Sequence, residues 1–332
     1  MTVAPIRARL TPSMKPTLGA VRPMTFVAAD AAWDLPGHVR AGSAVRRWGE
    51  RFVVVQDDVH ALALVDPRTG QCTAVPLPRG ADGRRTFGES TGNKGFKMDL
   101  EACVVLGDGR LVVLGSGSKG PRERVVVVTP ELEVRVIEAG ELYGMLRREV
   151  GFAGSELNLE GAAVVGGAVR FFQRGNGAPR GELQPVDATG ELELGAFARW
   201  LDGGPLPPLE RVRPVDLGET AGVRFGFTDA TVLPDGRVAF VAGAEDSPDT
   251  YRDGAILGGR FGVMDGEAVW VADILDVDGT PSRVKLEGID WIEETPEGWS
   301  FMVVADMDTP EVPALMGTLT VCAAGVPSAA AT

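Results

Sequence analysis

The sequence is poor in histidine and cysteine, and each shortage removes a class of site. Two histidines, His38 and His60, in 332 residues exclude a multi-histidine metal centre and argue against a Ser-His-Asp triad. The three cysteines are widely spaced and form neither a disulfide framework nor a zinc-binding pattern. We interpret them as small apolar residues in strands.

Long apolar runs and positive charge are also lacking. No apolar run approaches the length of a membrane-spanning helix, and the N-terminal stretch has no apolar core of a signal peptide. Lys and Arg total 33 against 46 Asp and Glu, a formal net charge of −13. Such a surface repels the phosphate backbone of nucleic acids. We therefore expect a soluble, cytoplasmic protein that binds neither membranes nor nucleic acid.

Glycine and proline, by contrast, are abundant, with 44 and 23 residues. This favours short strands joined by turns over a helical bundle. Five segments share one layout, in which a short strand, a tight turn and a very apolar strand precede a polar loop. They begin at Ser43, Asp99, Asn158, Phe227 and Lys285, so successive starts are 56, 59, 69 and 58 residues apart. This period is typical of four-stranded propeller blades.

The repeats predict an all-β fold, a β-propeller of four-stranded blades around a central channel, with five blades favoured over six. Two stacked sandwiches would explain the apolar strands but not their repeated register. We expect one domain over residues 20–325, with Met24–Ala28 completing the last blade, and flexible tails at 1–19 and 326–332. A short helix is predicted over Glu141–Glu149.

Three repeats open with a Leu-Glu pair, which contains Glu101, Glu160 or Glu287. The first strand of each blade lines the channel, so these carboxylates converge and repel one another unless a cation neutralises them. Hydroxyl residues stand at the same register in the other repeats, and the ring reads Ser43, Glu101, Glu160, Thr228 and Glu287. An all-oxygen set favours Ca²⁺ first and Mg²⁺ second. The alternative is that these glutamates are solvated edge charges or accept hydrogen bonds from neighbouring backbone N–H groups.

Basic residues gather on loops at the same end of the blades. Those assigned to substrate binding are Lys94, Lys97, Lys119 and Arg174. If these loops meet over the channel mouth, they suit an anionic small molecule such as a phosphate. Asp57 and Asp58 end the apolar strand of the first repeat and are the candidate catalytic residues that orient a water. Each of these charges, taken alone, is also compatible with a solvated loop position.

Four segments resemble the blade-opening segments of the calcium-activated nucleotidases, or apyrases. They are NKGFKMDLEACVV, LNLEGAAVVGGAVRFFQRGN, FGFTDATVLPDGRVAF and RVKLEGIDWI. The resemblance implies a five-bladed propeller with one axial Ca²⁺ held by one oxygen-bearing residue per blade, with Thr228 in place of a serine. It also implies that Asp57-Asp58 matches the family's Asp-Asp pair. The chain departs from the pattern at Val59-His60-Ala61, where the family has Arg-Thr-Gly, and at Gln173-Arg174, where it has two arginines.

Three functions remain open from the sequence. The leading hypothesis is a Ca²⁺-dependent hydrolase of a phosphorylated or other anionic small molecule, such as a phosphoanhydride of a nucleotide. The second is a non-catalytic binding module with a structural axial Ca²⁺. The third is an ester or lactone hydrolase that uses the same ion. The Leu-Glu-Gly openings are also loosely similar to those of bacterial propellers described as esterase-like or phytase-like. An axial calcium site suits all three.

Overall fold

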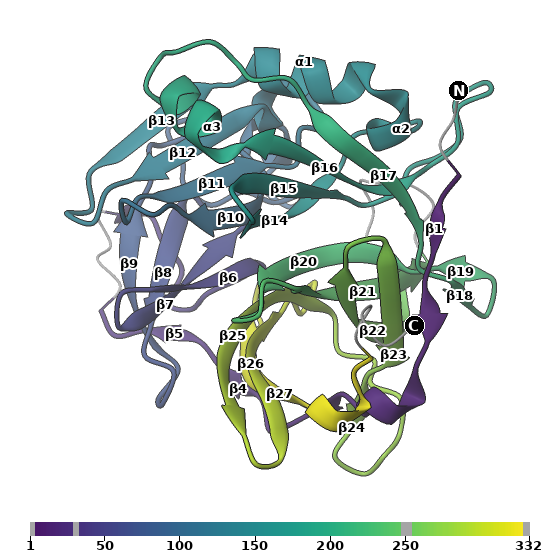
Figure 1. Cartoon of the computed structure of the whole chain (residues 1–332). Coiled ribbons are helices and arrows are strands. Elements are labelled where there is room, and N and C mark those ends of the chain that lie inside the picture. The colour runs from purple at the N-terminus through teal and green to yellow at the C-terminus, as the bar shows by residue number, and fades with distance from the viewer. Residues whose placement is uncertain (1–3, 29–32, 247–253, 328–332) are drawn as a thin grey trace.

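The computed structural model describes residues 4–28, 33–246 and 254–327, and it is a five-bladed β-propeller (Figure 1). The predicted fold class is confirmed. Each blade is an antiparallel sheet whose strands run outward from the axis in chain order. The innermost strands are β6 (Gly42–Trp48), β10 (Leu100–Val105), β14 (Leu159–Val165), β20 (Gly226–Val232) and β25 (Leu286–Thr295).

The outer strands of the blades follow in the same order. The second strands are β7 (Arg51–Gln56), β11 (Leu111–Gly115), β15 (Ala168–Gln173), β21 (Val238–Asp246) and β26 (Gly298–Ala305). The third strands are β8 (Ala61–Val65), β12 (Arg124–Val128), β16 (Asp187–Glu193), β22 (Ala255–Asp265) and β27 (Leu315–Val321). The fourth strands of blades 1 to 4 are β9 (Gln71–Pro76), β13 (Val134–Glu138), β17 (Glu210–Asp216) and β23 (Ala268–Asp273). Blade 5 takes its fourth strand from the N-terminal segment.

Turns at the inner hairpins follow the glycine signals of the sequence. In blade 2 the β10–β11 turn places Gly109 at φ 86°, and in blade 4 the β20–β21 turn places Gly236 at φ 88°. These are left-handed conformations that glycine adopts without steric cost. Each Asp-Gly pair therefore reverses the chain between two apolar strands.

The apolar core is divided into five clusters, one between each pair of neighbouring blades. Blades 1 and 2 share the cluster around Val53 and Leu100, and blades 2 and 3 the one around Val112 and Phe171. The remaining clusters lie between blades 3 and 4, 4 and 5, and 5 and 1. The last of these closes the ring, since Val304 of blade 5 packs with Val45 of blade 1. Burial of apolar surface between the blades is thus the main force that holds the ring together.

The N-terminal residues form a strap around the outside of the ring (Figure 1). Four short strands pair in turn with the outer edges of blades 3, 4, 5 and 1: β1 (Ile6–Arg7), β2 (Arg9–Leu10), β3 (Thr17–Leu18) and β5 (Thr25–Phe26). Strands β4 (Arg22–Pro23) and β24 (Leu275–Asp276) extend the edge of blade 5. Between β2 and β3, Met14 of a 3₁₀ turn is fully buried, in the cluster that joins blades 4 and 5.

Two predictions for this segment are wrong. Described residues within 1–19 do not form a flexible tail, because β1, β2 and β3 donate and accept backbone hydrogen bonds along sheet edges. The strand that completes blade 5 is β3, whereas the predicted Met24–Ala28 pairs through β5 with the first blade. These strands are only two residues long, which is too short for an alternation of apolar and polar residues, so the sequence carries no signal for them. The predicted tail at 326–332 lies mostly outside the described residues.

Three helices lie between the strands of blades 2 and 3. They are α1 (Gly140–Arg148), which confirms the predicted helix, α2 (Val150–Ala153) and α3 (Leu194–Leu201). All three bury apolar side chains in the cluster between these blades. A two-stranded hairpin of β18 (Glu219–Thr220) and β19 (Val223–Arg224) precedes blade 4. Within the described chain, no helix is long and apolar enough to cross a membrane.

Candidate functional site

One feature of the backbone recurs in all five blades: a bulge near the start of the innermost strand. In each first hairpin the pairing register shifts by one residue, at Gly42/Ala44, Leu100/Ala102, Leu159/Gly161, Phe227/Asp229 and Leu286/Gly288. The unpaired residues are the five members of the predicted ring, Ser43, Glu101, Glu160, Thr228 and Glu287. A bulge re-aims its extra side chain. The equivalence of the five positions, predicted from the repeats, is therefore present in the backbone.

The bulges lie at one end of the channel, where a cavity of about 400 Å³ opens. Ser43, Glu101, Glu160 and Glu287 line it, and Thr228 does not. The Thr228 hydroxyl is buried and donates to the carbonyl oxygen of Leu286, at 2.8 Å. Four of the five predicted metal ligands thus face one cavity, and the hydroxyl of the fifth is used to join blade 4 to blade 5.

Below the cavity an ion pair fills the axis of the channel. Arg46 of β6 reaches across to Asp229 of β20, with its two terminal guanidinium nitrogens each 2.7 Å from an oxygen of the carboxylate. The same guanidinium donates to the carbonyl oxygens of Ala162, Ala230 and Ile289. Although burial opposes the charged form, the Asp229 carboxylate raises the pKa of Arg46 above its usual value. This pair links the innermost strands of four blades and makes the pocket a blind one.

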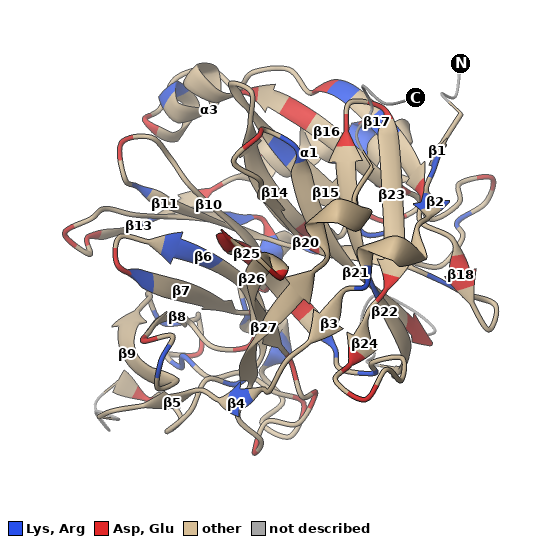
Figure 2. Ribbon diagram, turned by 60° about the horizontal axis from the view of Figure 1, so that its bottom comes forward, with Lys and Arg blue, Asp and Glu red and all other residues tan. Residues whose placement is uncertain are grey.

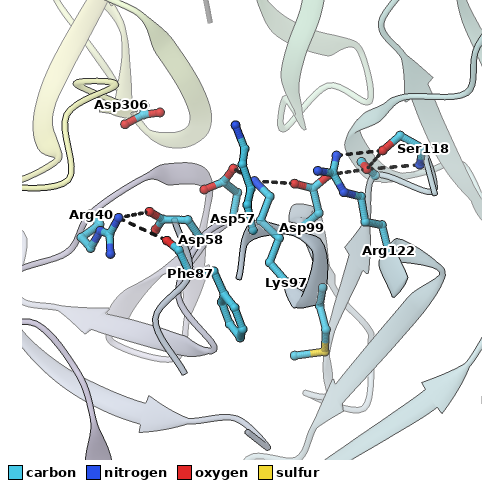
Figure 3. Close-up of polar contacts among 12 residues, drawn as sticks. Arg40, Asp57, Asp58, Phe87, Lys97, Asp99, Ser118, Arg122 and Asp306 are labelled. Atoms are coloured by element: carbon cyan, nitrogen blue, oxygen red, sulfur yellow. Dashed lines mark hydrogen bonds and ion pairs between the residues drawn. The ribbon is translucent and has the colours of Figure 1, made fainter. Parts of the chain in front are cut away.

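A row of alternating charges crosses the wall formed by blades 1 and 2 (Figure 3). The Lys97 ammonium lies 2.5 Å from Asp57 and 2.6 Å from Asp99, and the Arg122 guanidinium lies 2.6 Å from the other oxygen of Asp99. Asp99 also accepts from the Ser116 hydroxyl at 2.5 Å. Although burial opposes ionisation, Lys97 and Arg122 hold the pKa of Asp99 below its usual value. Lys97 is therefore a fixed cation of the wall.

The opposite wall, from blades 3 to 5, is built in the same way. The Arg174 guanidinium lies 2.8 Å from Glu245, 3.5 Å from Glu160 and 4.0 Å from Glu287. Glu160 also accepts from the side-chain amide of Asn158 at 2.6 Å. The Lys285 ammonium lies 2.5 Å from Asp308 and 3.6 Å from both Glu287 and Asp306. Each cation of this wall serves several carboxylates.

The carboxylates nevertheless outnumber the cations. Eleven carboxylates and six cationic side chains are among the described residues that line the cavity, an excess of five negative charges if all are ionised. Burial, reinforced by neighbouring carboxylates, raises the pKa of Glu160 to about 7 and that of Glu287 to about 8. The pKa of Glu101 is raised well above its usual value by burial and by Asp57, Asp99 and Glu160. The pocket is therefore short of positive charge.

Glu101 differs from its neighbours in its contacts. Its carboxylate makes no hydrogen bond and no ion pair with any residue that the structure describes. It is close enough to Asp57 and Asp99 for one oxygen of each to lie within 4.8 Å of the others. One oxygen of Asp57 and one of Asp58 are also buried without a hydrogen-bond partner. Buried acceptors in this condition call for a proton or a cation.

Asp58 is held on the other side by Arg40 (Figure 3). The Arg40 guanidinium lies 2.6 Å from Asp58 and donates to the carbonyl oxygen of Phe87 at 3.3 Å. Burial and the charge of Asp57 raise the pKa of Asp58 to about 7, against the opposing effect of Arg40 and Lys97. Asp58 can therefore exchange a proton near neutral pH.

The other predicted site residues divide clearly. The predicted catalytic pair Asp57 and Asp58 and the predicted substrate-binding Lys94, Lys97 and Arg174 all line the cavity. Lys94 begins a 3₁₀ turn (Lys94–Phe96) at the rim, 3.4 Å from Glu89. The prediction that Lys119 binds substrate is not supported, because Lys119 is exposed outside the lining and Arg122, one short turn later, reaches it instead.

Sequence reasoning missed several residues of the pocket, namely Arg40, Asp99, Asn158, Asn176, Glu245 and Lys285. A signal for some of them is present. Polar residues precede two of the bulge glutamates at a spacing of two. Lys97 and Asp99 precede Glu101 in this way, and Lys285 precedes Glu287. Residues at this spacing lie on one face of an extended segment. Charged positions occur throughout the molecule, mostly in loops and at strand ends, so charge alone does not single out the pocket (Figure 2).

Solved structures with a loose overall likeness to this chain are also known. A luciferin-regenerating enzyme is 9% identical with a TM-score of 0.46, covering 92% of this chain and 97% of its own. A gluconolactonase from Xanthomonas campestris is 14% identical with a TM-score of 0.41, covering 95% and 100%. A calcium-binding regucalcin from Agrobacterium tumefaciens is 10% identical with a TM-score of 0.43, covering 95% and 97%.

Comparison of the sequence with known families identifies one match. No curated protein sequence matches the chain. The profile of a family of unknown function, DUF6929, matches residues 38–321, which include every blade strand except the N-terminal fourth strand of blade 5 and every residue of the pocket named above. The chain therefore belongs to the DUF6929 family.

Proposed function

We propose that this protein is a Ca²⁺-dependent hydrolase whose active site is the axial pocket. The observation that carries the proposal is the ring of five bulges, which brings Ser43, Glu101, Glu160 and Glu287 to one blind cavity with an excess of carboxylates. Bulges are common next to active sites. Buried carboxylates with raised pKa values mark candidate functional sites in the same way.

The donor set fits a hard divalent cation. All four side chains offer oxygen, which Ca²⁺ prefers, and the Glu101 carboxylate makes no hydrogen bond or ion pair with a described residue. Lys97 and Arg174 already neutralise Asp57, Asp99 and Glu245, so they do not supply the missing charge. Bound there, the ion would polarise the bond to be broken and lower the pKa of a coordinated water.

The chain's own residues supply the remaining roles. Asp58, with a pKa of about 7, is suited to take a proton from the attacking water. Arg40 orients the Asp58 carboxylate. Asp57, whose other oxygen is bound by Lys97, stands beside it. Lys97 holds Asp57 in place beside Asp58, because its ammonium is bound to the Asp57 carboxylate. From the resemblance to the calcium-activated nucleotidases, this proposal takes the axial Ca²⁺ and its ligands. It does not take the nucleotide substrate.

Hydrolysis of a panel of carboxylic esters, lactones and phosphate esters, measured with Ca²⁺ and with excess chelator, tests the proposal. Turnover should require Ca²⁺ and fall by at least about 100-fold in Asp58→Asn, the usual loss when a general base is removed. Glu50→Gln is the matched control, because Glu50 is exposed at the β6–β7 turn outside the pocket lining. Turnover that persists in chelator would refute the proposal. Stabilisation by Ca²⁺ without turnover would instead favour the non-catalytic binding module.

A further inference from the structure

The charge of the pocket restricts what it can hold. Of the described residues that line it, eleven are carboxylates and six are cationic, and with all of them ionised one divalent cation would still leave an excess of three negative charges. A phosphate brings up to two more negative charges into the same space. Like charges that share a cavity of about 400 Å³ repel one another, and salt screens this repulsion less for the buried carboxylates than for exposed ones. The six cationic side chains are already included in this balance, and four of them, Lys97, Arg122, Arg174 and Lys285, are bound to carboxylates.

The lining also offers no surface for an aromatic ring. Phe87 is the only aromatic residue among the described residues of the lining. Its ring is covered, since it is 1% exposed and packs against His60 with ring centroids 4.4 Å apart. Proteins that hold nucleobases usually stack them on exposed aromatic or arginine planes. The arginines at this site already lie against carboxylates.

What the lining does offer is a dense set of hydrogen-bonding groups. Twenty-two of its twenty-six described residues are charged or polar, and the four others are Ala41, Phe87, Gly88 and Pro310. Donors and acceptors alternate on both walls, so that a hydroxyl group can donate to a carboxylate and accept from a neighbouring ammonium or amide. A site built to bind hydroxyl groups discriminates strongly against molecules that lack them, because its polar groups are then left unpaired.

We infer that the ligand of the axial pocket is a compact, hydroxyl-rich molecule that carries neither a phosphate group nor an aromatic ring. This inference rests on the proposed function for the position of the site, and it deepens that proposal by naming the substrate class. Among the hydrolases left open by the sequence, it selects one that acts on an ester or lactone of a polyol over one that acts on a nucleotide.

Matched pairs of probes test the inference through binding, independently of turnover. Thermal shifts of the Ca²⁺-loaded protein would be measured with D-glucose, D-xylose and myo-inositol, with the monophosphate of each, and with uridine and UMP. At least one unphosphorylated polyol should bind, and its phosphate should bind at least about fivefold more weakly at physiological salt. Uridine and UMP should give no shift. Tighter binding of the phosphates or of UMP, or no shift with any polyol, would overturn the inference.

A variant of the rim isolates the electrostatic cause. Glu89 and Glu311 are exposed at the cavity mouth, so the double variant Glu89→Gln/Glu311→Gln removes two charges, including the rim partner of Lys94, without touching the buried network. The affinity for a polyol phosphate should rise about threefold relative to the parent polyol. The control Glu50→Gln/Glu297→Gln makes the same change in net charge at exposed turns outside the pocket lining and should alter neither affinity. An equal rise in both variants would contradict the explanation.

The two proposals fail separately. If polyols bind, phosphates do not, and no compound is hydrolysed, the hydrolase proposal falls and the substrate class stands. If phosphate esters are hydrolysed with Ca²⁺ and bind more tightly than their parent polyols, the hydrolase proposal stands and the inference falls.

Discussion

His60 should make the protein less stable as the pH falls below about 6.5. Its Nδ1 lies 3.0 Å from the carbonyl oxygen of Pro78, and its Nε2 accepts the N–H of Met98 at 2.9 Å. A carbonyl accepts and an N–H donates, so only the neutral ring with the proton on Nδ1 satisfies both contacts. The residue is 2% exposed, and burial lowers the pKa of His60 to about 4.

The magnitude follows from the two states of the chain. In the unfolded chain a histidine takes up a proton near pH 6.5, whereas folded His60 takes it up only near pH 4. Between these values the unfolded state binds more protons, so the free energy of unfolding falls as the pH falls. The loss attributable to His60 is about 2 kcal/mol between pH 7.5 and 5.0, and it reaches about 3 kcal/mol below pH 4.

Urea unfolding of the wild type and of His60→Gln at pH 7.5 and 5.0 measures this loss. Glutamine keeps one donor and one acceptor but does not titrate, so carboxylate effects common to both proteins cancel. The wild type should lose about 2 kcal/mol more than the variant between the two pH values. Because the chain has two histidines, the His60 imidazole signal is identified in an NMR titration by its absence from the variant. Parallel pH profiles, or a His60 signal that titrates near pH 6.5, would refute this reasoning.

Three further predictions concern the axis. Arg46→Met leaves the buried Asp229 carboxylate without its partner and should lower the free energy of unfolding in urea by about 3–5 kcal/mol. Adding Asp229→Leu should restore part of that loss, and additive losses would contradict a direct pair. Gly288→Ala should cost about 1–3 kcal/mol by the same measurement, because its Cβ would meet the Val45 nitrogen at 2.9 Å, and unchanged stability would show that the blades can separate there. Thr228→Val should leave the Kd for Ca²⁺ unchanged in calorimetry, since its hydroxyl is bound to a backbone carbonyl; a tenfold weaker Kd would return this residue to the ring of ligands.

The ring of five bulge residues could be predicted from the sequence because the same local strand geometry recurs in each of the five blades. The first strand of every blade contains a bulge at the channel, and in two blades the sequence of this bulge is Leu-Glu-Gly. Glu160 and Glu287 are the bulged residues, and Gly161 and Gly288 follow them. A Cβ on Gly161 would lie 3.2 Å from the Asp229 Cα, so glycine allows neighbouring strands to approach closely. Local repetition of this kind is visible in a single sequence.

What could not be predicted depends on contacts between distant segments. The strap consists of two-residue pairings with edges far away in the chain, and no local pattern records them. The balance of charge in the pocket depends on which cations reach inward. Lys119 and Arg122 are equally basic in sequence, yet only Arg122 lines the cavity. His60 stands where the resemblance leads us to expect Arg-Thr-Gly, and its role becomes clear only from its contacts with Pro78 and with Met98, which lies between Lys97 and Asp99.

Binding of Ca²⁺ to the axial pocket is the central claim, and chelator-stripped protein unfolded in urea as Ca²⁺ is added back tests it most directly. A ligand that binds only the folded state stabilises it by about 2.7 kcal/mol at a hundredfold excess over its Kd. The wild type and Glu50→Gln should show this increase, and Glu101→Gln should not, although its stability without Ca²⁺ should equal or exceed that of the stripped wild type. A free energy of unfolding that ignores Ca²⁺ in all three proteins, with no retained metal by elemental analysis, would contradict the account.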